Sequence, residues 1–159
     1  MNKSLLASSI ALALGCGIAA EALAQANPNQ LIAQRKGAMN LQGKYFGSML
    51  AMVQGRVPYD ARTVQRNADY LAVLTQLPWD DFQPSTVGAA NTKAKEDIYK
   101  DQAKFKAGIE ALQMDVQKLA GAARAGDQTA VHAAVRDVGR SCNSCHEAFA
   151  TFEFRFKLQ

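Results

Sequence analysis

Cys142-Asn143-Ser144-Cys145-His146, near the end of this 159-residue chain, is the stretch around which the rest of the sequence is interpreted. Its two thiols can add across the vinyl groups of a haem, and the adjacent imidazole can ligate the iron from the same side. On a helix these three side chains share one face, because they are three and four residues apart. The motif therefore predicts one covalently attached haem c per chain, bound through Cys142 and Cys145.

Three other interpretations of the motif compete with haem attachment. A thioredoxin-like redox site also uses Cys-x-x-Cys, but it needs a strand–helix–strand setting, and no strand pattern surrounds this motif. A structural zinc site needs four protein ligands. The mature chain has two cysteines and two histidines, but His132 is badly placed, so a zinc site would need help from carboxylates. The third is a chance occurrence of the five-residue pattern. The haem site is favoured over all three, because these two would be the only cysteines of a helical, exported chain.

The N-terminus has the pattern of an export signal. Lys3 gives a positive start, Leu5–Ala20 is an apolar run, and Ala22-Leu23-Ala24 is a small-x-small cleavage site. The run is too short to span a membrane as a helix. We predict that residues 1–24 are a cleaved signal peptide, that the mature protein starts at Gln25, and that it is periplasmic without a membrane anchor.

An alternative leader is a lipoprotein signal cut before Cys16, but Ala13 stands at the third position before the cysteine, where such signals usually carry leucine. Cleavage at Gln25 removes Cys16 and leaves both remaining thiols for the haem. Loss of Lys3 and Glu21 with the leader keeps the net charge at +4. No dense run of lysine and arginine is present, so the sequence predicts no nucleic-acid partner.

The remaining chain, residues 25–159, reads as one all-α domain with four helices. Apolar residues recur at helical spacing, and capping and stop residues separate the segments. The helices are expected at about 28–54, 61–77, 93–125 and 128–156. The last of them has an apolar stripe with both cysteines in register: Val131, Val135, Val138, Cys142, Cys145, Phe149, Phe152 and Phe156. This pattern predicts an antiparallel four-helix bundle with the haem attached on the inner face.

Residues 78–91 form a longer connection than bundle helices usually need. Trp79 and Phe82 stand there among proline, glycine, serine and aspartate. Aromatic side chains in a polar loop usually fold back onto apolar surface. Trp79 and Phe82 are therefore expected to pack either against the edge of a haem or against the ordinary hydrophobic core.

A Cys-x-x-Cys-His motif near the C-terminus of a helical bundle resembles the cytochrome c prime family, the class II c-type cytochromes. The resemblance covers the whole mature chain. It also includes three segments in the family's order and spacing: Tyr59-Asp60-Ala61, Leu77-Pro78-Trp79 with Phe82, and Ala125-Gly126-Asp127.

The resemblance implies roles for three residues: His146 as the fifth iron ligand, Met39 over the distal haem face and Arg35 near a haem propionate. It also implies a homodimer through the first two helices. One position departs from the family pattern. Ala150 stands where relatives usually carry a basic residue that covers the proximal face, and Arg155 and Lys157 are expected to lie too far along the helix to replace it.

The sixth coordination position decides between two functions. If Met39 is a non-bonded lid, the iron is five-coordinate and can bind NO or CO. If Met39 ligates, the haem is a low-spin, six-coordinate electron carrier with His146 and Met39 as axial ligands. Electron transfer to an unidentified redox partner is compatible with both states. We expect no enzyme, because no acid–base pair or nucleophile accompanies the motif, and His132 is expected on the surface.

Overall fold

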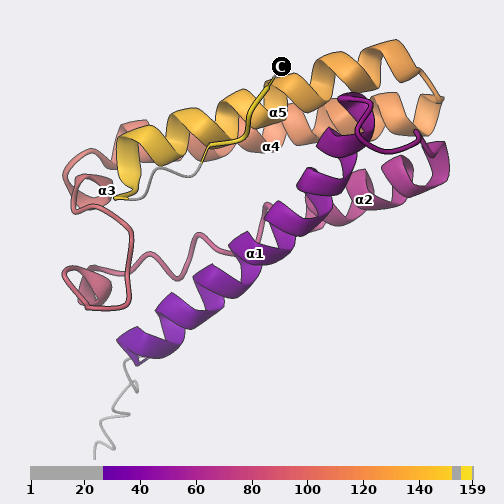
Figure 1. The fold of residues 1–159 in the computed structure, drawn as a ribbon. Helices are drawn as coiled ribbons and strands as arrows, with labels where there is room; N and C mark the ends of the chain where they lie inside the picture. Colours follow the sequence, from indigo (N-terminus) through magenta and orange to yellow (C-terminus); the bar gives the residue numbers. More distant parts are fainter. Residues whose placement is uncertain (1–26, 152–154, 159) are drawn as a thin grey trace, which may run out of the picture.

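The computed structural model describes residues 27–151 and 155–158 (Figure 1). The expected signal peptide and its cleavage site lie outside these residues. The elements are α1 (Pro28–Val53), α2 (Ala61–Leu74), the short 3-10 helix η1 (Pro84–Thr86), α3 (Asp97–Lys100), α4 (Gln102–Ala125) and α5 (Gln128–Phe149). Within the described ranges, no helix has the length and apolar character needed to cross a membrane.

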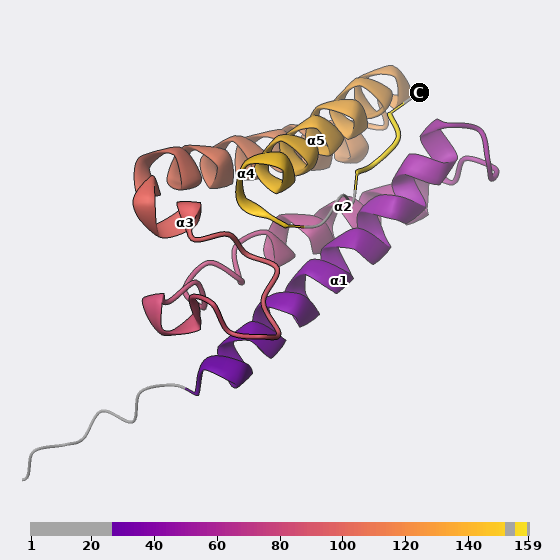
Figure 2. The ribbon, with the colours of Figure 1, turned by 60° about the vertical axis from the view of Figure 1, so that its left-hand side comes forward.

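The four long helices form the expected all-α bundle. α4 and α5 lie side by side and antiparallel, and α2 packs against both α4 and α1 (Figures 1 and 2). α1 contacts α5 less extensively, and its N-terminal half diverges from the α4–α5 layer in both views. The predicted antiparallel four-helix bundle is therefore confirmed, and the widest separation between helices lies on the α1–α5 side.

Capping residues lie at the ends of the helices, at N-termini as well as at a C-terminus. The Asn27 side chain accepts the N–H of Asn29 at 2.9 Å at the start of α1. Asp60 accepts the N–H of Thr63 at 2.6 Å, and Asp127 that of Ala130 at 2.9 Å. Gly126 ends α4 with a φ of 70°, which costs a residue without a Cβ little. These caps satisfy donors that the helices themselves leave unpaired.

The core is most tightly packed at the closed end of the bundle, where α1 leads into α2 and α4 leads into α5. Apolar side chains from all four helices are completely excluded from solvent there. They are Met49, Val64, Ala68, Val116, Leu119, Ala120, Val131, Val135 and Val138. Burial of this kind is the dominant favourable contribution to folding.

The third helix does not begin near residue 93 as expected. α4 begins at Gln102, with Asp101 accepting the N–H of Lys104 at 3.0 Å as its cap. Ile98, which lies within the expected helix 93–125, is buried in the separate short helix α3. The apolar spacing was correct, but Asp101 interrupts the helix because its side chain caps the following turn.

The fourth helix ends at Phe149 and not near residue 156. Ala150 adopts an extended backbone and forms an antiparallel bridge with Ala94. The Lys95 N–H donates to the Phe149 carbonyl at 2.9 Å, and the Thr151 N–H to the Lys93 carbonyl at 2.8 Å. This pairing replaces the hydrogen bonds of a further helical turn. Phe152 lies outside the described residues, and Phe156 is not helical.

The other two helices differ less from expectation. α1 ends at Val53, one residue before the expected end. α2 ends at Leu74, with Thr75 as its C-cap, and not at residue 77. Leu77, the last apolar residue assigned to this helix, lies in the turn that follows and is 56% exposed.

Candidate functional site

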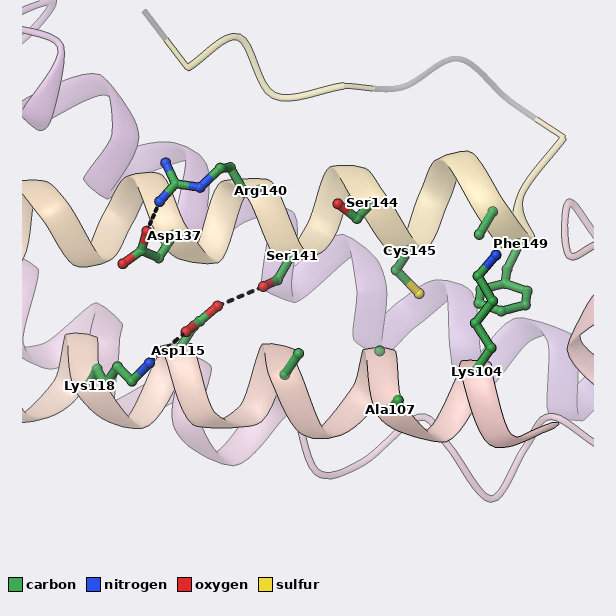
Figure 3. A pocket seen from close by; sticks show the side chains of 13 residues that line it. Lys104, Ala107, Asp115, Lys118, Asp137, Arg140, Ser141, Ser144, Cys145 and Phe149 are labelled. Carbon is green, nitrogen blue, oxygen red and sulfur yellow. Dashed lines mark hydrogen bonds and ion pairs between the residues drawn. The ribbon is translucent and has the colours of Figure 1, made fainter. Parts of the chain in front are cut away.

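The Cys-x-x-Cys-His motif occupies the last turns of α5. The stripe that contains it is fully buried at Val131, Val135 and Val138, but Cys142, Cys145 and His146 are only partly buried. Cys142 packs against the hydrophobic core, whereas Cys145 faces α4 (Figure 3). The two thiols therefore point to different neighbours, although they are one helical turn apart.

Both thiols are free, and both lie in apolar surroundings. Burial raises the pKa of Cys142 to about 12, with a smaller contribution from the neighbouring Cys145. Burial also raises the pKa of Cys145. A thiol with a raised pKa is a poor nucleophile in water, because the thiolate is the reactive form. Both thiols are therefore protonated at neutral pH.

Met39 lies opposite this motif, on α1. Gly139 of α5 and Phe46 of α1 approach each other closely, since a Cβ at Gly139 would lie 3.2 Å from the Phe46 ring. The helices are antiparallel, Met39 precedes Phe46 by seven residues, and His146 follows Gly139 by seven. Met39 and His146 therefore occupy the same level of the bundle.

Burial decreases at this level on both helices. On α1, Ile32 and Phe46 are 2% and 1% exposed, yet Met39, which lies between them on the same stripe, is only partly buried. A Cβ built at Gly43, one turn from Met39, would meet no atom within 4 Å. Two inward-facing stripes that lose their packing at one level leave room for a flat apolar group. The residues present therefore fit a haem attached through the α5 motif.

Arg35 lies one turn from Met39 and is only 4% exposed. Its guanidinium donates to the hydroxyls of Thr86 and Thr92, both at 3.2 Å, and stacks 4.4 Å from the Phe82 ring centroid. No described carboxylate pairs with it. A buried guanidinium with only neutral partners is well suited to an anion such as a propionate.

Trp79 and Phe82 fold inward from the connection after α2. The Trp79 indole donates to the Thr75 carbonyl at 2.6 Å and stacks 6.0 Å from Phe82. Phe82 packs 5.1 Å from Phe105, which in turn lies 5.3 Å from Phe149. This aromatic cluster gives both residues a partner in the protein and connects Arg35 to the end of α5. Their contact with haem remains a prediction.

Several residues of this region carried no signal in the sequence. Thr86 and Thr92 hold Arg35, and the Tyr99 hydroxyl lies 2.9 Å from that of Thr86. They come from a connection without periodicity, so no pattern could bring them together before the fold was known. Asn143, a variable position of the motif, also has a structural role that its sequence context does not reveal: it binds the backbone of Phe156.

Two basic side chains lie in places other than expected. His132 is partly buried at the closed end, with its ring 6.0 Å from that of Tyr59, and is not a fully exposed surface residue. Arg155 was expected too far along a continuous helix to return to the haem motif. Because α5 ends at Phe149, the chain folds back, and Arg155 lies 3.3 Å from Glu147, next to His146 in sequence.

A groove of about 600 Å³ runs between α4 and α5 beside Cys145 (Figure 3). Small side chains of α4, Ala107, Gly108 and Ala111, form its floor. At one end Ser141 donates to Asp115 at 2.7 Å, which connects the two helices just before the motif. The groove leads from solvent to the second thiol.

The chain matches known proteins over this whole arrangement. The sequence model of the family described as Cytochrome C' matches residues 30–150. Cytochrome c' from Alcaligenes xylosoxydans xylosoxydans is 40% identical over 124 residues, which are 78% of this chain and 95% of that protein. A nitric oxide complex of a variant of cytochrome c prime from Alcaligenes xylosoxidans superposes with a TM-score of 0.75 at 38% identity, covering 80% of this chain and 98% of that one. The structure of cytochrome c' from Rubrivivax gelatinosus gives a TM-score of 0.75 at 34% identity, over 79% and 98%.

Proposed function

The chain belongs to the cytochrome c prime family, whose members carry covalent haem c, and from that premise we propose that it is a periplasmic gas-binding cytochrome. Its iron would be five-coordinate and open to NO or CO, and it could also exchange electrons with a redox partner. The relatives that it matches are named as cytochromes. The observation that carries the proposal is the loss of packing around Met39 at the level of His146.

Cys142 and Cys145 would hold the haem, and His146 would ligate its iron from the α5 side. Bound haem supplies an iron that can change oxidation state and bind a diatomic gas. The side chains around it determine access. Met39, which is partly buried, would cover the distal face from α1, and the buried Arg35 would offer its positive charge to a propionate. An apolar lid admits a small neutral gas and excludes solvated anions, because desolvating an anion is costly.

The α4–α5 groove supports the electron-transfer part of the proposal. It opens beside Cys145, so a partner protein could approach the edge of the attachment site there. On the distal side, α1 and Met39 would cover the haem. Electrons and gas would therefore reach the haem from different sides of α5.

The optical spectrum of the holoprotein, oxidised and reduced, with and without CO, tests the state of the iron. We expect a high-spin spectrum that changes when CO is added to the reduced protein. A low-spin spectrum indifferent to CO would mean that Met39 is a ligand, and the chain would then be a six-coordinate electron carrier. Absence of haem after expression in a host that makes haem c would contradict both functions.

A homodimer is the second part of the proposal. Four exposed apolar side chains lie on the outer side of the α1–α2 pair: Leu41 at 43%, Tyr70 at 47%, Val73 at 62% and Leu77 at 56% exposed. Tyr70 contacts Tyr45 of α1 at 5.1 Å, and the antiparallel register places Leu41 near Val73 and Leu77. A contiguous exposed apolar patch of this kind is typical of a protein interface.

Sedimentation equilibrium tests the dimer. We expect a dimer for the parent protein and a monomer for Val73→Glu, because a charge in the centre of an apolar interface is desolvated without a partner. Met114→Glu is a matched control, since Met114 is 55% exposed on α4, away from the α1–α2 patch. A monomeric parent protein would contradict the proposal, as would a dimer that survives Val73→Glu.

A further inference from the structure

Residues 155–158, here called the C-terminal strap, fold back along α5 toward the middle of the bundle (Figure 2). The strap is extended, and its side chains alternate: Arg155 and Lys157 are exposed, whereas Phe156 and Leu158 are partly buried against the core. This alternation is that of a strand with one buried face. The strap lies beyond residue 150, where the match to the family ends.

Side chains of α5 and α1 hold the backbone of the strap through hydrogen bonds. Asn143 uses both ends of its amide: it accepts the N–H of Phe156 at 2.8 Å and donates to the Phe156 carbonyl at 2.9 Å. From the C-terminus of α1, Gln54 donates to the Lys157 carbonyl at 2.6 Å. The strap is thus bound to α5 and to α1 at the same time.

The apolar side chains of the strap fill the space between the two helices. The Phe156 ring packs edge-on against Phe46 of α1, with the centroids 4.5 Å apart. Leu158 lies over Gly139 of α5, where any side chain would collide with it. Gly139, Cys142, Asn143 and His146 are three or four residues apart, so they follow one side of the helix. The strap therefore contacts α5 on both sides of Cys142.

We propose that the C-terminal strap is a lid that closes the α1–α5 side of the haem site and shields Cys142 and the adjoining haem edge from solvent. The inference rests on haem attachment at Cys142, as proposed above. It goes further because it assigns a function to a segment outside the family match and to Asn143, a variable position of the motif. Asn143 is a positioning residue in this proposal, since it holds the strap and not the haem.

Thiol alkylation of the reduced, haem-free chain tests the lid without depending on haem. Asn143→Ala removes both hydrogen bonds between Asn143 and Phe156, and Gly139→Ala displaces Leu158. Deletion of residues 155–159 removes the strap itself. We expect each change to raise the alkylation rate of Cys142 by about tenfold and to leave Cys145, which faces the α4–α5 groove, within about twofold of the parent.

Cys145 serves as an internal control, and Ser144→Ala as a matched variant at the other, exposed variable position. We expect Ser144→Ala to change neither rate. An unchanged Cys142 rate in all three strap variants would overturn the proposal. An equal acceleration of both thiols would also overturn it, because it would mean that the bundle had loosened as a whole.

The midpoint potential of the holoprotein gives a second readout. Exposure of haem to water favours the more highly charged ferric state, so we expect Asn143→Ala to shift the potential to more negative values and Ser144→Ala to leave it unchanged. An unshifted potential in Asn143→Ala would contradict the lid. A chain that takes up no haem at all would contradict the proposed function, while the alkylation experiment would still decide the role of the strap.

Discussion

The two ends of the bundle are built from the same four helices but differ in packing. At the closed end, Met49, Val64, Val116 and Val135 are completely buried. At the other end, here called the open end, Met39 and the Cys-x-x-Cys-His residues continue the same stripes and are only partly buried. Inward-facing positions are therefore filled by protein at the closed end, whereas at the open end they lie where we propose that the haem binds.

The polar groups of the two ends differ in the same way. At the closed end Arg124 and Asp69 form an ion pair of 2.7 Å near the surface. At the open end Arg35 is buried among hydroxyls and an aromatic ring, without a described acidic partner. Arg124 pairs with an acidic side chain of the protein itself, so this pair concerns the fold alone. A buried arginine with only neutral partners, such as Arg35, is a candidate for binding an external anion.

The largest effect is expected from the thiols of the open end. Replacing both, Cys142→Ser with Cys145→Ser, should abolish covalent haem, because a hydroxyl does not form the thioether bonds. A haem-stained denaturing gel and the pyridine haemochrome spectrum measure the loss. Ser144→Ala should retain full haem content. Haem that remains covalently attached to the double variant would contradict the assignment of the site.

Truncating one apolar side chain at each end tests the packing contrast. Leu119→Ala should lower the free energy of unfolding of the haem-free chain by about 2–5 kcal/mol, because Leu119 is completely buried. Met39→Ala should cost less than about 1 kcal/mol, since partly exposed side chains contribute little. Denaturant titration of both variants measures the difference. Equal losses would mean that the protein itself fills the space beside Met39.

The two arginines give the next comparison. Arg35→Gln should move the midpoint potential of the holoprotein to more negative values, because a buried positive charge near the haem favours the reduced state. The shift should correspond to a change in the free energy of reduction on the order of 1 kcal/mol per electron. Arg124→Gln should leave the potential unchanged and alter the free energy of unfolding by about 0–1 kcal/mol, as is usual for an exposed ion pair. Spectroelectrochemical titration of both variants measures the potentials. Equal potentials in Arg35→Gln and the parent would contradict a propionate role for Arg35.

The smallest effect concerns the cap of α2 at the closed end. Hydrogen bonds from Thr63 lower the pKa of Asp60 below its ordinary value of 3.8. The ionised carboxylate therefore stabilises the folded state above that pH, and this contribution is lost as the pH falls through the lower folded-state pKa. Asp60→Asn keeps a capping oxygen and removes the titration. Its unfolding free energy should vary less between pH 5 and about pH 2.5 than that of the parent. Identical pH dependence in both proteins would contradict this role.

Local signals in the sequence were sufficient for the long helices. Asn27, Asp60 and Asp127 cap helices because each side chain meets an N–H only two or three residues away. The valines of α5 and the cysteines in register with them define its inner face in the same local way. Arg35 and Met39 were assigned through family resemblance; in the structure Met39 is partly buried, and Arg35 is buried one turn away from it.

The sequence failed where distant backbone groups meet. The end of α5 depends on the bridge between Ala94 and Ala150, which are far apart in the chain, whereas α4 begins at its own cap, Asp101. The apolar periodicity continues past both boundaries, at Ile98 and Phe156, so it did not indicate where either helix begins or ends. A helix ends when its carbonyls and amides find other partners, and those partners came from another segment.

The sequence by itself determined the haem attachment motif, the apolar stripes and the caps, because each depends on residues within about one or two helical turns of one another. Only the tertiary structure decided which stripe positions stay open, that Thr86 and Thr92 hold Arg35, and that residues 155–158 return to Asn143. These depend on contacts between segments far apart in the chain. The sequence pattern does not specify such contacts, because any apolar or hydrogen-bonding residue could in principle supply them.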